Sequence, residues 1–141
     1  MESTFEADVN YLAVILAALA AQALGFLWYG PLFGGRWMAL RGYSEADVRA
    51  DASPMVYVLP LLAAVLIAYV LARLVDMAGA DSVGDCIAVA VFAWSGFTAT
   101  ATAMQINFSP HATNKPLLFA VEGGYYLALF LIAGAIIGAF Q

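Results

Sequence analysis

Four long stretches without a charged side chain decide most of what this chain can fold into. Three are uninterrupted, and the fourth contains only Glu122: Val9 to Gly35, Ala52 to Ala72, Cys86 to Pro110, and Pro116 to Gln141. An α-helix rises about 1.5 Å per residue, so roughly 20 apolar residues cross the hydrocarbon core of a bilayer. Each stretch is long enough to do so, which predicts an integral membrane protein.

The fold class follows from the hydrogen-bonding needs of a backbone in lipid. Of the 141 residues, 65% are hydrophobic and 11% charged, a composition unlike that of a soluble domain. Only helices or a closed barrel satisfy the backbone in lipid, and continuous apolar runs without period-two alternation favour helices. We predict an all-α fold in one membrane domain, residues 1–141. It is a four-transmembrane-helix bundle with spans at about 10–29, 54–74, 85–107 and 116–140, and a short interfacial helix between the first two.

The cationic side chains predict how the bundle is oriented. The first connection carries Arg36, Arg41 and Arg49, the third carries Lys115, and the second carries only Arg73. Because cytoplasmic loops are enriched in Lys and Arg, the first and third connections are expected inside. Both termini then lie outside the cytoplasm, N-out and C-out. The first eight residues hold carboxylates and no basic side chain, so no signal peptide is expected.

The first connection begins with a helix-ending pair, Gly30-Pro31. The stretch Arg36 to Arg41 then mixes apolar side chains with two arginines, which suits a short helix at the level of the lipid headgroups. Trp28, Trp37 and Tyr57 are predicted to belong to an aromatic belt at this boundary.

Glu122 is the residue most suggestive of function. A carboxylate in a membrane helix is costly if it faces lipid, so it normally faces protein or water. Glu122 lies about six residues past the start of the fourth predicted span, about 9 Å in. Lys115, Tyr125 and Tyr126 fall near the same helix face. Two interpretations stay open: a structural hydrogen bond between helices, or a proton-coupling or ligand-binding carboxylate.

Other polar side chains in the spans suggest a pocket around Glu122. The third span carries a polar stripe within about 100° of arc: Trp94, Ser95, Thr98, Thr102 and Gln105. In the predicted topology, seven residues of three spans lie in the cytoplasmic half, and our hypothesis is that they form one ligand-binding pocket: Glu122, Gln22, Tyr29, Thr102, Gln105, Tyr125 and Tyr126. The alternative is that they only join helices, at about 0.6 to 2 kcal/mol per contact.

Glycines of the fourth span predict close helix packing. They cluster about 145° away from Glu122: Gly123, Gly124, Gly134 and Gly138. Small residues let helix backbones approach each other in lipid, so this face predicts a homo-oligomer. A fully central fourth helix would explain the same pattern.

Two segments resemble a known family. The first is Leu24 to Gly34, LGFLWYGPLFG, followed by Trp37-Met38 and Gly42-Tyr43-Ser44-Glu45. The second is the fourth span, with Gly123, Tyr125 and the ending Gly134-Ala135-Ile136-Ile137-Gly138. This pattern resembles the small bacterial membrane proteins grouped as domain of unknown function 1761. The resemblance implies a four-helix architecture in the bacterial inner membrane, and it brings no activity, cofactor or catalytic residue.

The sequence offers little for catalysis. It has no nucleotide-binding loop and no recognisable nucleophile or metal motif, and a single cysteine and a single histidine give no ligand set. We therefore predict no enzyme activity, no cofactor, no metal and, without a basic field, no nucleic-acid partner. The leading hypothesis is a non-enzymatic helical module that binds a lipid, small molecule or membrane-protein partner in a polar intramembrane pocket. The alternatives are a small oligomeric transporter or channel that uses Glu122, and then a membrane enzyme.

Overall fold

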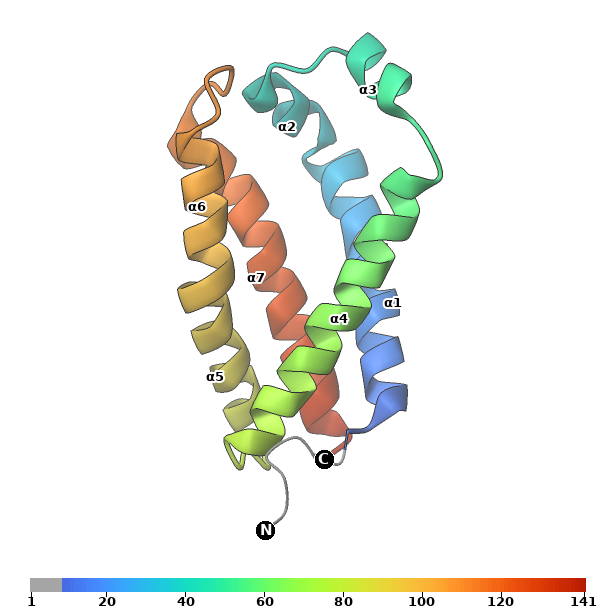
Figure 1. Cartoon of the computed structure of the whole chain (residues 1–141), viewed down its shortest axis with the longest axis vertical. Helices are drawn as coiled ribbons and strands as arrows, with labels where there is room; N and C mark the ends of the chain where they lie inside the picture. The colour runs from blue at the N-terminus through green and yellow to red at the C-terminus, as the bar shows by residue number, and fades with distance from the viewer. Residues whose placement is uncertain (1–8) are drawn as a thin grey trace.

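The computed structural model describes residues 9–141, and this part of the chain forms an all-α bundle (Figure 1). Four helical spans are long and apolar enough to cross a membrane, which confirms the predicted fold class. Each begins and ends within three residues of its prediction: Tyr11–Leu32, Met55–Met77, Val83–Asn107 and Lys115–Ala139.

Two of the four spans contain a π-helical segment. The first consists of α1 (Tyr11–Leu27) and η1 (Trp28–Leu32), and the third consists of α5 (Val83–Ala93), η2 (Trp94–Thr98) and α6 (Ala99–Asn107). The second and fourth are the single helices α4 (Met55–Met77) and α7 (Lys115–Ala139). The first connection contains two short helices, α2 (Gly34–Arg41) and α3 (Glu45–Asp51).

Polar side chains fix where several helices begin. The side chain of Asn10 accepts a hydrogen bond from the Ala13 amide and caps α1, and Asn114 does the same for α7. Ser82 caps α5, and Ser44 forms a capping box with Asp47 at the start of α3. These side chains replace bonds that the first amides of a helix cannot make within it.

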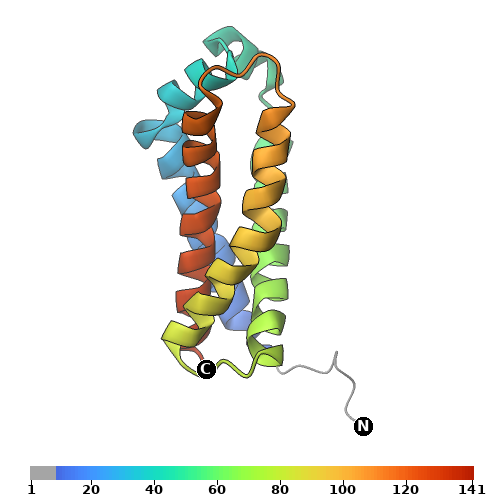
Figure 2. The same cartoon turned by 90° about the vertical axis from the view of Figure 1, so that its left-hand side faces the viewer.

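The two ends of the bundle differ in what they carry. The start of α1, the C-terminus and the connection from α4 to α5 lie at one end, here called the terminal end (Figures 1 and 2). The opposite end, here called the α2 end, holds α2, α3 and the connection from α6 to α7. Which of these ends faces the cytoplasm stays a prediction, and the tail, residues 1–8, lies outside the described residues.

Helix α7 packs against α1, α5 and α6 (Figure 2). In its terminal half Gly134 and Gly138 are buried against α5. A Cβ atom on Gly138 would lie 2.7 Å from the Cα of Val83, and one on Gly134 would lie 2.9 Å from the Cβ of Ala90. These two glycines therefore serve packing within the chain, as a central fourth helix requires, and the predicted homo-oligomer stays untested.

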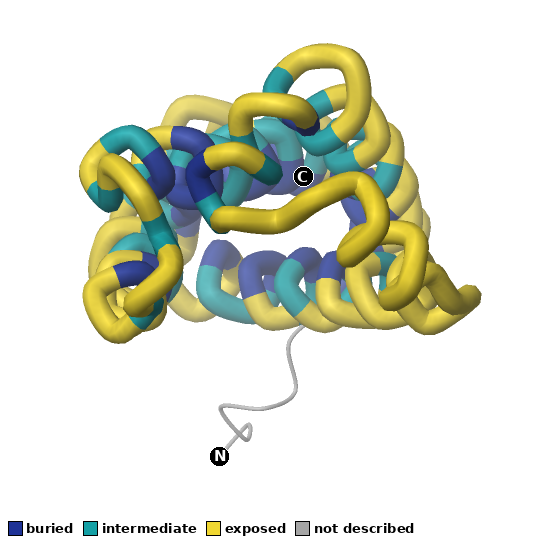
Figure 3. The backbone as a smooth tube through the Cα atoms, turned by 90° about the horizontal axis from the view of Figure 1, so that it is seen from above, coloured by how far each residue is buried: buried dark blue, intermediate teal, exposed yellow. Residues whose placement is uncertain are grey.

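The outer surface of the spans is largely apolar. In the view along the bundle, the exposed parts of the helices point outward and the buried parts point toward the centre (Figure 3). Large apolar side chains such as Leu19, Leu62 and Phe92 are exposed, whereas small ones such as Ala17, Ala68 and Ala90 are buried. Such a surface fits a bundle whose surroundings are acyl chains rather than water.

A break in the first span directs the chain back over the bundle. Gly30 in η1 has the non-helical angles φ −103° and ψ −106°. A Cβ atom on Gly34 would lie 2.5 Å from the carbonyl oxygen of Tyr29, so only glycine fits the start of α2. Helix α2 consequently leaves the direction of α1 and contacts α7.

Candidate functional site

The buried carboxylate of Glu122 binds two side chains of α2. The Nε and Nη2 atoms of Arg41 donate to its two oxygens at 2.8 and 2.5 Å, in a bidentate ion pair. The indole nitrogen of Trp37 donates to the first of these oxygens at 3.0 Å. We call these three residues and Ser109 the Glu122 site.

The other donors of Arg41 extend this site to the third connection. Its Nη1 atom donates to the Ser109 hydroxyl group at 3.2 Å, and that hydroxyl donates to the backbone carbonyl of Gln105 at 2.9 Å. The side chains of Arg41 and Glu122 are only 12% and 10% exposed. A buried charge of either sign requires a partner, and the forked guanidinium group matches a carboxylate in geometry and charge.

Backbone contacts hold α2 over the site. Gly42 ends the helix with φ 76°, and the amide of Thr113 donates to the carbonyl of Leu40 at 2.9 Å. Leu40 is buried in a small cluster with Ile106, Leu118 and Val121, which come from α6 and α7. This cluster and the ion pair together join α2, α6 and α7 at the α2 end.

Two tryptophans fix the part of α7 that carries Glu122. Each is the first residue of a π-helical segment, Trp28 in η1 and Trp94 in η2. The indole of Trp28 donates to the carbonyl of Val121 at 3.0 Å, and the indole of Trp94 donates to that of Gly123 at 3.1 Å. The carbonyls on both sides of Glu122 are therefore held from two different neighbours, the first span and the third span. Segments of π-helix often occur at functional sites.

Aromatic rings surround the ion pair. Tyr29 lies edge-on to Trp37, with ring centroids 5.4 Å apart, and to Tyr125 at 5.1 Å. Tyr126 follows, with its ring centroid 5.2 Å from that of Tyr125. Tyr29 interacts electrostatically with both charged groups of the ion pair, and Tyr126 interacts with Glu122. The structure thus brings together four of the seven predicted pocket residues.

The other three predicted residues lie elsewhere or contribute differently. The side chain of Gln22 donates to the carbonyl of Tyr57 at 3.1 Å and so joins α1 to α4. Gln105 has an exposed side chain, and it contacts the Glu122 site through its backbone carbonyl. Thr102 is buried in α6. The structure does not bring Gln22 and Gln105 to the carboxylate, and the ligand-binding role of all seven residues stays a prediction.

The sequence reasoning missed the two partners of Glu122. It assigned Trp37 and Trp28 to an aromatic belt and Arg41 to the headgroup level, whereas all three donate hydrogen bonds to α7. One signal was present: Trp37 and Arg41 are four residues apart, so they share a face of one helix. A single unpaired carboxylate in the spans needed such a partner.

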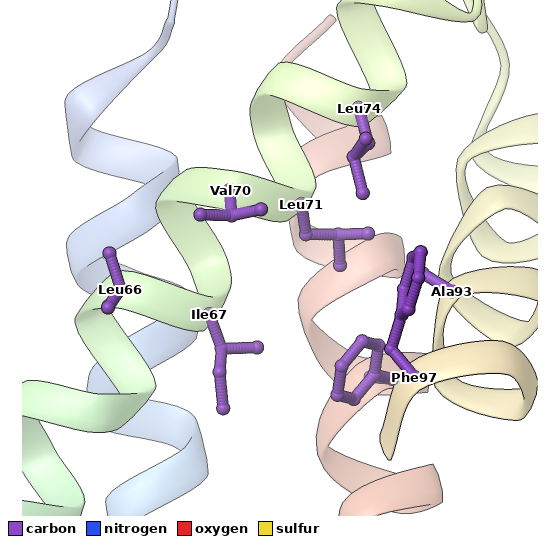
Figure 4. A pocket seen from close by; sticks show the side chains of 8 residues that line it. Leu66, Ile67, Val70, Leu71, Leu74, Ala93 and Phe97 are labelled. Carbon is purple, nitrogen blue, oxygen red and sulfur yellow. The ribbon is translucent and has the colours of Figure 1, made fainter. Parts of the chain in front are cut away.

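An apolar groove lies on another side of α7. It has a volume of about 210 Å³ and is open at the surface. Figure 4 shows side chains of α4 facing those of the third span across it. Its lining, from α4, α5, η2 and α7, contains no charged or polar residue: Leu66, Ile67, Val70, Leu71, Leu74, Ala93, Phe97 and Phe130.

The two sites offer different chemistry. The Glu122 site is largely closed, because its carboxylate already binds Arg41 and Trp37 and the Glu122 side chain is only 10% exposed. The groove is open and can accept only apolar groups.

Comparison with known proteins gives one match: the family model described as Protein of unknown function (DUF1761) matches residues 12–138. Neither a curated protein nor a solved structure matches the chain.

Proposed function

This chain belongs to the DUF1761 family of proteins of unknown function, and we propose that it is a non-enzymatic membrane module that binds the acyl chain of a lipid. The observation that carries the proposal is the open groove between α4 and the third span, with its wholly apolar lining. The sequence suggested a ligand in a polar pocket, but the carboxylate expected to bind it is already paired with Arg41. The ligand is therefore assigned to the groove.

Selective binding in a bilayer depends on fit. Lipid tails are as apolar as leucine, so contact with the groove brings little hydrophobic gain over contact with other lipids. Dispersion contacts are individually small and add up only where many atoms meet at the right distance. A groove with walls on three helices offers an acyl chain more such contacts than a single convex helix does.

Filling the groove tests the proposal. Val70 lines the groove and is 45% exposed, so a Val70→Trp side chain can occupy the groove without disturbing the core. We expect this variant to lose co-purified lipid, measured by native mass spectrometry in mild detergent. The matched control is Leu19→Trp, because Leu19 is 54% exposed on α1 and does not line the groove. Equal lipid retention by both variants and the unchanged protein would contradict acyl-chain binding.

A small oligomeric transporter or channel is the second candidate. It is favoured by the buried ion pair, since charged residues inside spans mark ion and substrate pathways in many transporters. The expected result is that Glu122→Gln abolishes solute or proton flux in proteoliposomes. Unchanged flux in this variant, with the fold retained by circular dichroism, would contradict the transporter.

A further inference from the structure

We infer that the lipid in the groove is an anionic phospholipid whose phosphate lies beside Lys115 at the α2 end. This inference rests on the proposed function and adds the headgroup and the direction of the lipid. It rests on the arrangement of α4, α6 and α7, on the distance along α7 between the groove and Lys115, and on the charge at the α2 end.

The two spans beside the groove lie closer together at one end of the bundle than at the other (Figure 1). Helix α4 packs against α5, and the two converge at the terminal end (Figure 1). Toward the α2 end, α4 and α6 diverge. Helix α7 lies behind both, as the view in Figure 2 also indicates. In this proposal the lipid lies along this side of α7, with its headgroup at the α2 end, where the spans are farther apart.

The distance along α7 matches one leaflet. Phe130 lines the groove, and Lys115 is the first residue of the same helix. The two residues are 15 positions apart, which corresponds to a rise of about 22 Å and a rotation of about 60°. A bilayer is about 40–45 Å thick with its headgroups, so one lipid spans about 20–22 Å. A phospholipid whose phosphate is level with Lys115 thus ends its tail near Phe130.

The charge at the α2 end selects the headgroup. The ammonium group of Lys115 donates to the carbonyl of Asn107 at 2.9 Å, in the last turn of α6. An ammonium group has three donors, so it can bind a phosphate oxygen as well. Arg36 is exposed at the same end. The three carboxylates of α3, which are those of Glu45, Asp47 and Asp51, lie on the other side of this end from α6 (Figure 1).

The test compares lipids that share acyl chains and differ in charge. The protein is incubated with an equal mixture of phosphatidylglycerol and phosphatidylcholine, and the retained lipids are counted by native mass spectrometry. A cation near the membrane surface attracts anionic lipid by about 1 kcal/mol, which corresponds to about a fivefold preference. We expect Lys115→Gln to lower the ratio of phosphatidylglycerol to phosphatidylcholine about fivefold. Lys115→Arg, which keeps the charge, is expected to preserve the ratio.

The control removes a cation from the same end but away from α6. Arg49 lies on α3, where it pairs with Glu45 at 3.6 Å, and Arg49→Gln is expected to leave the ratio unchanged. If Lys115→Gln changes the ratio no more than Arg49→Gln does, the headgroup assignment is wrong. The Val70→Trp variant separates this outcome from failure of the proposed function. It should lower retention of both lipids equally, and if it changes neither, the groove itself binds no acyl chain.

Discussion

The two halves of α7 are fastened to the bundle by different interactions. At the α2 end, the half that carries Glu122 is held by an ion pair and by three indole hydrogen bonds. At the terminal end, Gly134 and Gly138 let α5 approach so closely that contacts reach backbone atoms. The first half depends on matched chemical groups and the second on the absence of side-chain volume.

This difference predicts how each half responds to substitution. Removal of one member of a buried ion pair leaves an unpaired charge, which costs more than loss of the pair as a whole. A side chain that adds volume to a close helix contact also destabilises the fold. Only an equal loss of volume on the facing helix can compensate for it. The α2 end should therefore be sensitive to single changes and tolerant of paired ones.

The largest effect is expected for Arg41→Met, which leaves the Glu122 carboxylate buried without its cation. We expect the free energy of unfolding to fall by about 3–5 kcal/mol, measured by denaturant titration in detergent micelles. The double variant Arg41→Met with Glu122→Gln should recover most of this loss, because the amide oxygen still accepts from Trp37. If the double variant is no more stable than the single one, a matched charge pair is not what holds this half together.

An intermediate effect is expected for Gly138→Ala in the terminal half. The new Cβ atom would lie 2.7 Å from the Cα of Val83, which belongs to the backbone and cannot turn aside. Overpacking of this kind lowers the free energy of unfolding by about 1–3 kcal/mol. The control is Gly96→Ala, since a Cβ atom on Gly96 meets nothing within 4 Å. Equal melting temperatures for the two variants would show that volume does not limit the terminal half.

The sequence predicted some features of the two halves of α7 and not others. Within one helix, the rise and rotation per residue place glycines and carboxylates correctly, so the buried position of Glu122 and the glycine face of α7 could be predicted. The pairing with Arg41 could not, because 81 positions separate the two residues. Their meeting depends on the break at Gly30, which turns α2 over α7. Helical periodicity gives no information on such a turn.

The groove could not be predicted for a related reason. Its lining residues are ordinary apolar side chains of three spans, and none carries a sequence signal. The groove depends on how α4 lies against the third span and α7, which is a feature of helix crossing rather than of any local pattern. Polar residues attract attention in a membrane sequence, whereas an open apolar site becomes visible only in three dimensions.

The smallest predicted effect lies outside the spans, in α3, and it extends the comparison to a helix without a buried face. In the capping box the amide of Ser44 donates to Asp47 Oδ2 at 2.8 Å, and the amide of Asp47 donates to Ser44 Oγ at 3.1 Å. The hydrogen bonds from Ser44 lower the pKa of Asp47 below its ordinary value. A carboxylate whose pKa is lowered by folding stabilises the folded helix at pH values above the pKa of the same group in the unfolded chain, which is about 3.9. That contribution is lost as the pH falls through the lower, folded value.

As the pH falls, α3 should therefore unfold locally before either half of α7 does. No residue of α3 is buried. The helix therefore depends on its caps and on the exposed ion pair between Glu45 and Arg49. We expect the amides of α3 to lose protection against hydrogen exchange below about pH 4, and Asp47→Asn to remove most of this pH dependence. The protection of the α7 amides near Glu122 should not change over the same range in either protein. If both segments opened together, the capping box would not be an independent unit, and α3 would share the stability of the ion pair at Arg41.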